Sequence, residues 1–267
     1  MWTLIWRTIK DRRIIISVYV AASIALLWMY VAFFPAIKDQ SANLEQLLQS
    51  YPESMMKAFN FDIKSLNTLE GFIATEQFSF VWPLLVIFML LGYSGSAIAG
   101  EIEKGTIEIL LSQPLSRLKL YFGRYLSGLL MLVLFTIFSI FAIFPIASLY
   151  DISLKTSHFL NFSILAFLFG LSIFSIGMFL SSVFSDRGKV FFIAGLFLVL
   201  MYVLNIIAAI RESLTDLKYA SFFFYFNPSL ALIYNKIDDY SYVVFLSVIV
   251  VFTLLGAIIF SKRDIAV

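Results

Sequence analysis

The sequence predicts an all-α membrane protein with six transmembrane helices, and three observations support this fold class. Of the 267 residues, 61% are apolar and 13% are charged, whereas a soluble domain has about a quarter of its residues charged. Six stretches without a charged residue are long enough to cross a bilayer, which takes about 20 helical residues. The 30 phenylalanines and 13 tyrosines suit interhelical gaps and the headgroup boundary. We therefore expect one transmembrane domain over residues 1–267.

The first 13 residues carry an amphipathic pattern. Their apolar residues recur at the spacing of one helix face, namely Trp2, Ile5, Trp6 and Ile9. Their basic residues lie away from that face, namely Arg7, Lys10 and Arg13. Tryptophan anchors at the headgroup level, and basic side chains face anionic lipid. Residues 1–13 are therefore predicted to form an interfacial helix along the inner leaflet, after which the chain turns into the bilayer.

The six predicted spans occupy residues 14–35, 77–100, 125–150, 156–185, 190–210 and 240–261. Segment 36–76 is too polar for the membrane and has helical apolar spacing, so we expect an extracytoplasmic helical cap. A loop that covers the bundle is favoured over a gate or an outer docking surface. The apolar stretch 219–235 is short and contains Asn227-Pro228, where proline interrupts a helix. This stretch is predicted to be a re-entrant or interfacial segment before the last span.

Small residues recur along the second predicted span. Gly92, Ser96 and Gly100 are spaced by four, as are Gly95 and Ala99. Small side chains let helix backbones approach closely in lipid. The pattern predicts that this span packs tightly against another helix.

Orientation follows from the positions of lysine and arginine, which are enriched in cytoplasmic loops. With the amino terminus inside, 12 of the 19 Lys and Arg residues fall on the inner side and seven in the longer outer loops. We therefore expect both termini in the cytoplasm of a protein that spans the plasma (inner) membrane several times.

Several function classes are disfavoured by residues that are missing. No Gly-x-x-x-x-Gly-Lys-Ser/Thr sequence is present, so the chain lacks the usual loop that holds ATP phosphates. The predicted spans contain no charged residue, although ion-coupled carriers generally need one. There is no cysteine and a single histidine, which disfavours a metal site or a bound cofactor. A net charge of +2 without one basic patch does not suggest nucleic acid.

The segment 100–117, predicted between the second and third spans on the inner side, is the most informative. Gly105 can end one helix in the left-handed conformation, and Thr106 can cap a short next one. Pro114 should stop that helix before Ser116 caps the third span. One side of the short helix would carry Ile107, Leu110 and Leu111. Such a helix fits a docking element for a cytoplasmic protein, and an ordinary polar connection is the alternative.

This segment resembles the ABC-2 type transporter permeases, whose pattern here is an acidic pair, Gly-Thr, Glu, two leucines, Ser, Pro and Ser-Arg. The matching residues are Glu101, Glu103, Gly105, Thr106, Glu108, Leu110, Leu111, Ser112, Pro114, Ser116 and Arg117. The resemblance extends weakly over the whole chain, through the spans, the amphipathic start, Asn227-Pro228 and Lys262-Arg263-Asp264.

The resemblance implies the permease subunit of an ATP-driven exporter. Two copies of a cytoplasmic ATP-binding subunit would hold ATP and Mg, and a second permease subunit, identical or related, would complete the pathway. Residues 106–111 resemble the coupling helix that fits a groove on that ATP-binding subunit. The implied contact residues are Glu101, Glu103, Gly105, Thr106, Ile107, Glu108, Leu110, Leu111, Pro114 and Arg117. A smaller second contact would use Asp186, Arg187 and Lys189.

A push from the ATP-binding subunit needs a stiff lever, which a helix continuous with the second span would provide. Glu101, Glu103 and Glu108 are expected to bond to this helix or to basic residues of the partner, and Arg117 to anchor the return at the membrane surface. The alternative function is a membrane anchor or scaffold that recruits a cytoplasmic protein without moving a solute.

Overall fold

The computed structural model describes residues 2–40, 67–112 and 115–264. Over these ranges the regular elements are helices, and no strand occurs. Six helical stretches of the described chain are long and apolar enough to cross a membrane, namely Trp2–Asp39, Leu69–Ala97, Arg117–Ser148, Thr156–Val183, Arg187–Ile210 and Asp239–Lys262. The predicted all-α fold class with six spans is therefore confirmed.

The first helix, α1 (Trp2–Asp39), joins the predicted interfacial helix and the predicted first span in one element. No glycine or proline occurs before Pro35, so nothing in the sequence breaks the helix near Arg13. Ile5 is buried against the bundle, while Trp2 and Trp6 are exposed. The two predicted segments are thus continuous, and the position of residues 2–13 at a membrane surface stays a prediction.

The second spanning stretch consists of α4 (Leu69–Ile73), the π-helical segment η2 (Ala74–Val81) and α5 (Trp82–Ala97). The prediction began this span after the charged Glu76, which the structure includes in the helix. Pro83 lies in the first turn of α5, and its missing donor and bulky ring suit the wider turns that precede it. Of the predicted cap 36–76, the two ends are helical extensions of the spans, and residues 41–66 lie outside the described chain.

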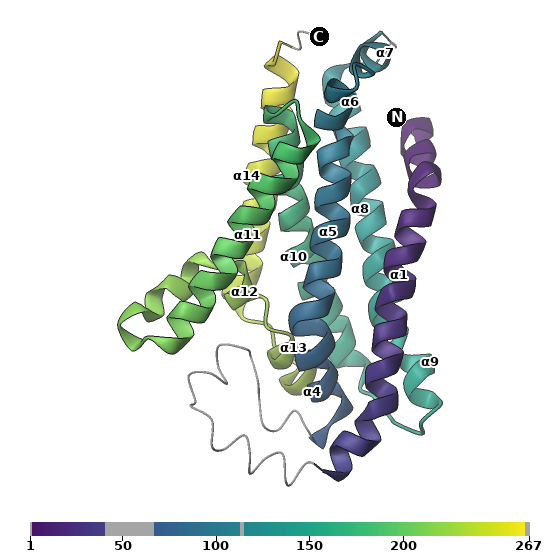
Figure 1. Cartoon of the computed structure of the whole chain (residues 1–267), viewed down its shortest axis with the longest axis vertical. Coiled ribbons are helices and arrows are strands. Elements are labelled where there is room, and N and C mark those ends of the chain that lie inside the picture. Colours follow the sequence, from purple (N-terminus) through teal and green to yellow (C-terminus); the bar gives the residue numbers. More distant parts are fainter. Residues whose placement is uncertain (1, 41–66, 113–114, 265–267) are drawn as a thin grey trace.

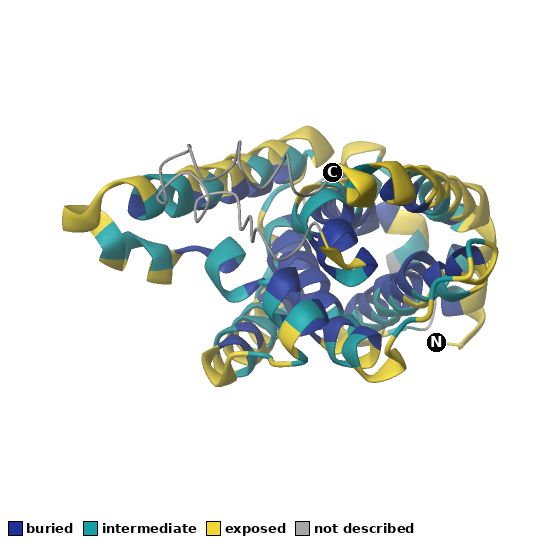
Figure 2. Cartoon of the chain, turned by 90° about the horizontal axis from the view of Figure 1, so that it is seen from below, coloured by how far each residue is buried: buried dark blue, intermediate teal, exposed yellow. Residues whose placement is uncertain are grey.

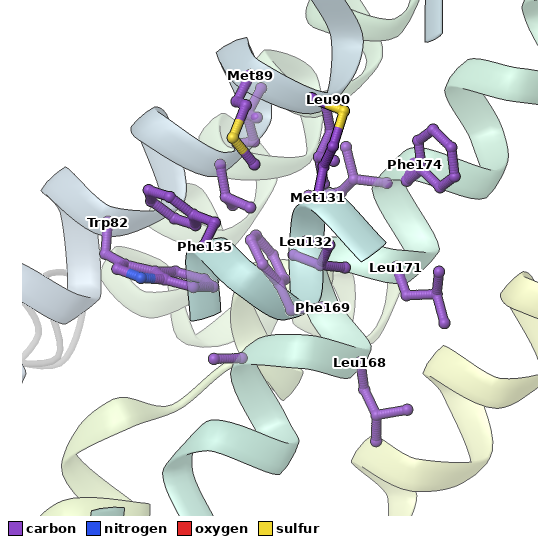
Figure 3. Close-up of a cluster of buried hydrophobic side chains, with 14 of the residues drawn as sticks. Trp82, Met89, Leu90, Met131, Leu132, Phe135, Leu168, Phe169, Leu171 and Phe174 are labelled. Carbon is purple, nitrogen blue, oxygen red and sulfur yellow. The ribbon is translucent and has the colours of Figure 1, made fainter. Parts of the chain in front are cut away.

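The centre of the bundle is α10 (Thr156–Val183), which packs against α5, α8 (Arg117–Phe141) and α14 (Asp239–Lys262). Figure 3 shows apolar side chains from α5, α8 and α10 that meet in this core, among them Trp82, Phe135 and Phe169. A short helix, α9 (Ile143–Ser148), completes the third spanning stretch. Burial of such rings supplies the packing that holds these three helices together.

The fifth span, α11 (Arg187–Ile210), leans away from the bundle, and the 3₁₀ segment η3 (Glu212–Ala220) packs on its far end (Figure 1). Seen along the bundle, buried residues face the middle and exposed residues the outside, with α11 and η3 to one side (Figure 2). The chain returns through α12 (Phe222–Tyr225) and α13 (Pro228–Tyr234) to α14. The predicted interruption at Asn227-Pro228 is confirmed, because Asn227 caps α13 and Pro228 occupies its first turn.

Candidate functional site

The segments predicted to meet a cytoplasmic partner gather at one end of the bundle. α6 (Ala99–Glu103) and α7 (Ile107–Leu111) follow α5 at this end, where α1 begins and α14 ends (Figure 1). The start of α11 lies beside α6, because the Arg187 backbone N–H donates to Glu103. The two contacts predicted separately from the sequence are therefore neighbours in the fold.

Two backbone features set the directions of α6 and α7. Ile98, between α5 and α6, has φ −130° and ψ −58° and so departs from helical geometry. The backbone N–H of Ala99 donates to the Ser181 hydroxyl of α10 at 3.0 Å, which satisfies a donor that the break would leave unpaired. The expectation of one helix continuous from the second span into the contact segment is therefore wrong.

Gly105 lies between α6 and α7 with φ 68°. This left-handed conformation costs glycine little because it has no Cβ. The backbone N–H of Gly105 donates to the Ile102 carbonyl at 3.0 Å. The prediction that Gly105 ends a helix in the left-handed conformation is confirmed.

The Glu101 side chain bonds to other residues of the same chain. One carboxylate oxygen accepts a hydrogen bond from Arg124 Nη2 at 2.9 Å, and the two side chains are 24% and 15% exposed respectively. The other oxygen accepts from the Thr106 hydroxyl, which also donates to the Glu101 carbonyl at 3.2 Å. Thr106 occupies the N-cap position of α7 but makes no side-chain cap bond. Its predicted capping role is therefore wrong, because its hydroxyl donates to Glu101.

Glu103 connects α6 to the start of α11. A carboxylate oxygen accepts from the Arg187 backbone N–H at 3.0 Å, and a negative charge is favourable at a helix N-terminus. Asp186 caps the same helix by accepting from the Lys189 backbone N–H at 3.0 Å. The side chains of Arg187 and Lys189 are exposed. This corner presents two positive charges outward and uses two carboxylates for its own structure.

The short helix α7 divides into an inner and an outer side. Ile107 is 1% exposed and belongs to the core, and Leu110 packs against that core. Glu108 is exposed, and Ile109 is 65% exposed. Leu111 ends α7, and Pro114 lies outside the described residues. Glu108 and Ile109 therefore lie on the outer side of α7, and Ile109 was not among the contact residues predicted from the sequence.

Polar contacts hold the chain in place where it enters the third span. Ser116 caps α8 by accepting from the Lys119 backbone N–H at 3.3 Å, as predicted. The Arg117 guanidinium donates to the Arg263 carbonyl at the end of α14. Arg263 in turn donates to the carbonyls of Ser182 and Phe184, at 3.0 Å each. Burial lowers the pKa of Arg263 from its ordinary value, but arginine stays charged at physiological pH.

Arg124 and its neighbours form a polar cluster that was not predicted from the sequence. Arg124 lies in α8 and bonds to Glu101 of α6 and, through Nη1, to the Thr8 hydroxyl of α1 at 3.3 Å. Arg12 of α1 donates to the Ser96 hydroxyl of α5 at 2.7 Å. A lone arginine directly before the uncharged stretch 125–150 was the only sequence signal for this cluster. Its partners come from distant parts of the sequence, so spacing could not reveal them.

A lateral apolar cavity of about 380 Å³ lies between parts of α5 and α11. Its lining includes Phe80, Phe88, Phe191, Gly195 and Tyr202. A cavity of this volume lies within the range of small-molecule pockets. It opens between two spans and its lining is apolar, which suits an apolar occupant.

Two comparisons with known proteins give different results. A family model described as ABC-2 family transporter protein matches residues 3–265. No curated protein matches the sequence significantly. The match covers every spanning helix and the whole α6–α7 segment.

Proposed function

Because the chain belongs to the ABC-2 family of transporter proteins, we propose that it is the membrane-spanning permease subunit of an ATP-driven exporter. Members of this family are membrane transport components that generally work with a separate ATP-binding subunit. In this proposal two such subunits bind ATP and Mg in the cytoplasm. A second permease subunit, identical or related, completes the transport pathway in the plasma (inner) membrane.

The observation that carries the proposal is the outward side of α7. Glu108 and Ile109 are exposed at the end of the bundle where α1 begins and α14 ends. An exposed isoleucine beside a carboxylate suits an apolar pocket rimmed by basic residues on a partner. Placing this end in the cytoplasm agrees with the excess of lysine and arginine on the predicted inner side.

In this proposal, the start of α11 forms a second part of the same contact with the ATP-binding subunit. Glu103 joins α6 to the Arg187 backbone, so a partner on α7 would also lie near Arg187 and Lys189. These exposed positive side chains would meet acidic groups of the ATP-binding subunit. Two neighbouring contact points would transmit a rotation as well as a push.

We infer that the cavity between α5 and α11 receives either the second permease subunit or the transported molecule. Its lining comes mainly from apolar side chains of both helices, with Phe80 of η2 and Phe223 of α12 beside them. α11 also presents large exposed apolar side chains, including Phe192, Val199 and Leu200. In the proposed dimer, these surfaces would face the partner permease, and export would use the space between the two halves.

The test is purification of the tagged chain from its native membrane, followed by subunit identification and an ATP hydrolysis assay. We expect an ATP-binding subunit to co-purify. Ile109→Ser should reduce its amount about tenfold, the effect of losing one well-packed apolar contact. Leu149→Ser is the matched control, because Leu149 is 70% exposed at a site away from α7 and should retain the partner.

Ile107→Ala separates folding from docking. Ile107 is buried, so its truncation should lower the melting temperature of the purified chain, whereas Ile109→Ser should leave the melting temperature unchanged. A purified assembly without an ATP-binding subunit would refute the proposal. Hydrolysis that is indifferent to α7 would favour the alternative, a scaffold that recruits a partner without moving a solute.

A further inference from the structure

An ion pair joins the proposed coupling segment to the third span. Arg124 Nη2 lies 2.9 Å from Glu101 Oε1, and both side chains are largely shielded from solvent. Arg124 Nε is also buried and has no hydrogen-bond partner among the described residues. A shielded guanidinium depends strongly on its carboxylate partner, because removing either group leaves the other charge uncompensated.

The same guanidinium reaches the first helix. Arg124 Nη1 donates to the Thr8 hydroxyl at 3.3 Å, and Thr8 is 5% exposed. α1 and α8 also pack side by side along their lengths. Arg124 therefore belongs to a pair of helices, α1 and α8, and holds Glu101 of α6 against that pair.

Glu101 is in turn tied to the start of α7. Its second carboxylate oxygen accepts from the Thr106 hydroxyl, directly after the left-handed Gly105. A displacement of α7 would thus act on Glu101 through Thr106 as well as through the backbone. Ile98 breaks the helix between α5 and α6, so α6 and α7 are not stiffly continuous with the second span.

We propose that Arg124 is a positioning residue that transmits movement of α6 and α7 to the α1–α8 pair through Glu101. This inference rests on the proposed function, because it assumes that an ATP-binding subunit moves α7. Since the helix is interrupted at Ile98, the side-chain bonds of α6 add a connection to other spans, and Glu103 provides one to α11. The ion pair at Arg124 supplies that connection to two further spans.

The experiment measures two distances in the purified complex with its ATP-binding subunit, before and after ATP plus vanadate. The chain has no cysteine, so a spin label attaches to this chain only at an introduced cysteine, and labelling it before assembly with the ATP-binding subunit keeps the partner unlabelled. Labels at Lys104 and Lys262 report α6 relative to α14. Labels at Lys10 and Lys262 report α1 relative to α14. We expect both distances to change in the otherwise unaltered protein.

Arg124→Gln should retain the change between Lys104 and Lys262 and lose most of the change between Lys10 and Lys262. The double variant Glu101→Arg with Arg124→Glu keeps the opposite charges and should restore the second change, a rescue that a general loss of stability would not produce. Lys119→Gln is the matched control, because Lys119 is an exposed cation on the same helix.

The outcomes separate the two proposals. If neither distance changes without a substitution, the proposed function itself fails. If both distances change and Arg124→Gln leaves the movement of α1 intact, the role of Arg124 is refuted. Thr8→Val, which keeps the ion pair and removes only the contact with α1, should reduce the movement of α1 less than Arg124→Gln.

Discussion

Individual glycines in the bundle differ in the space that surrounds them. A Cβ at Gly128 of α8 would lie 2.2 Å from Phe174 Cζ and 2.8 Å from a ring carbon of Tyr93. A Cβ at Gly92 of α5 would meet no atom within 4 Å. Glycine therefore allows close contact between helices at Gly128, whereas Gly92 faces open space.

Gly128→Ala should destabilise the protein by about 1–3 kcal/mol, the cost of overpacking a filled site. The ring of Phe174 would have to move, and it is itself packed against Tyr125. Gly92→Ala is the matched control and should be neutral or slightly stabilising, because alanine favours a helix over glycine. The measurement is thermal unfolding of the detergent-purified chain. Equal melting temperatures for the two variants would contradict this explanation.

The predicted packing of the second span against other helices is confirmed by the contacts of α5 with α10 and α11, but its small residues differ in their contribution. Gly95 packs against α11, since a Cβ there would lie 3.2 Å from the Arg187 carbonyl oxygen. Gly92, in the same predicted pattern, has no such neighbour within the chain. Spacing of small residues thus indicated the packing face correctly only near the end of α5.

At the scale of elements, α6, α7 and the start of α11 form one connected unit. Glu103 bonds to the Arg187 backbone, and Glu101 bonds to Thr106 and Arg124. α6 and α7 have five residues each and are too short to be stable alone. Their positions therefore depend on these side-chain bonds and on the turn at Gly105.

Gly105→Val should destabilise this unit by about 1–2 kcal/mol, because a side chain in the left-handed region clashes with the backbone. Gly105→Asn should be milder, since asparagine adopts that region more readily. Hydrogen exchange of the α6–α7 amides measures the effect locally. The valine variant should exchange faster there, with little change in α10. Unchanged protection in α7 would show that the turn does not hold this helix in place.

At the scale of the whole molecule, six spanning stretches place the start of α1 and the end of α14 at the same end (Figure 1). The η3 segment lies toward the opposite end, beyond the leaning α11. Once the membrane side of one end of the bundle is known, the side of the loops at both ends follows. Charge distribution favours the α6–α7 end in the cytoplasm.

Reporter fusions check this orientation. Green fluorescent protein fused after Val267 should fluoresce, and alkaline phosphatase at the same place should be inactive. Alkaline phosphatase inserted after Ser213, in η3, should be active, because that enzyme needs an exterior location. Phosphatase activity after Val267 would reverse the orientation and would place α7 on the wrong side for an ATP-binding subunit.

The sequence by itself determined the fold class, the six spans, the left-handed Gly105, the cap at Ser116 and the interruption at Asn227-Pro228. These features depend on local composition, proline and glycine geometry, and the length of uncharged stretches, all of which are readable along the chain. Tertiary structure alone decided that Ile107 points inward and Ile109 outward, that α6 breaks from α5 at Ile98, and that Arg124 binds Glu101 and Thr8. Those outcomes depend on which helices become neighbours, because contacts between side chains far apart in sequence are set by packing of the whole bundle.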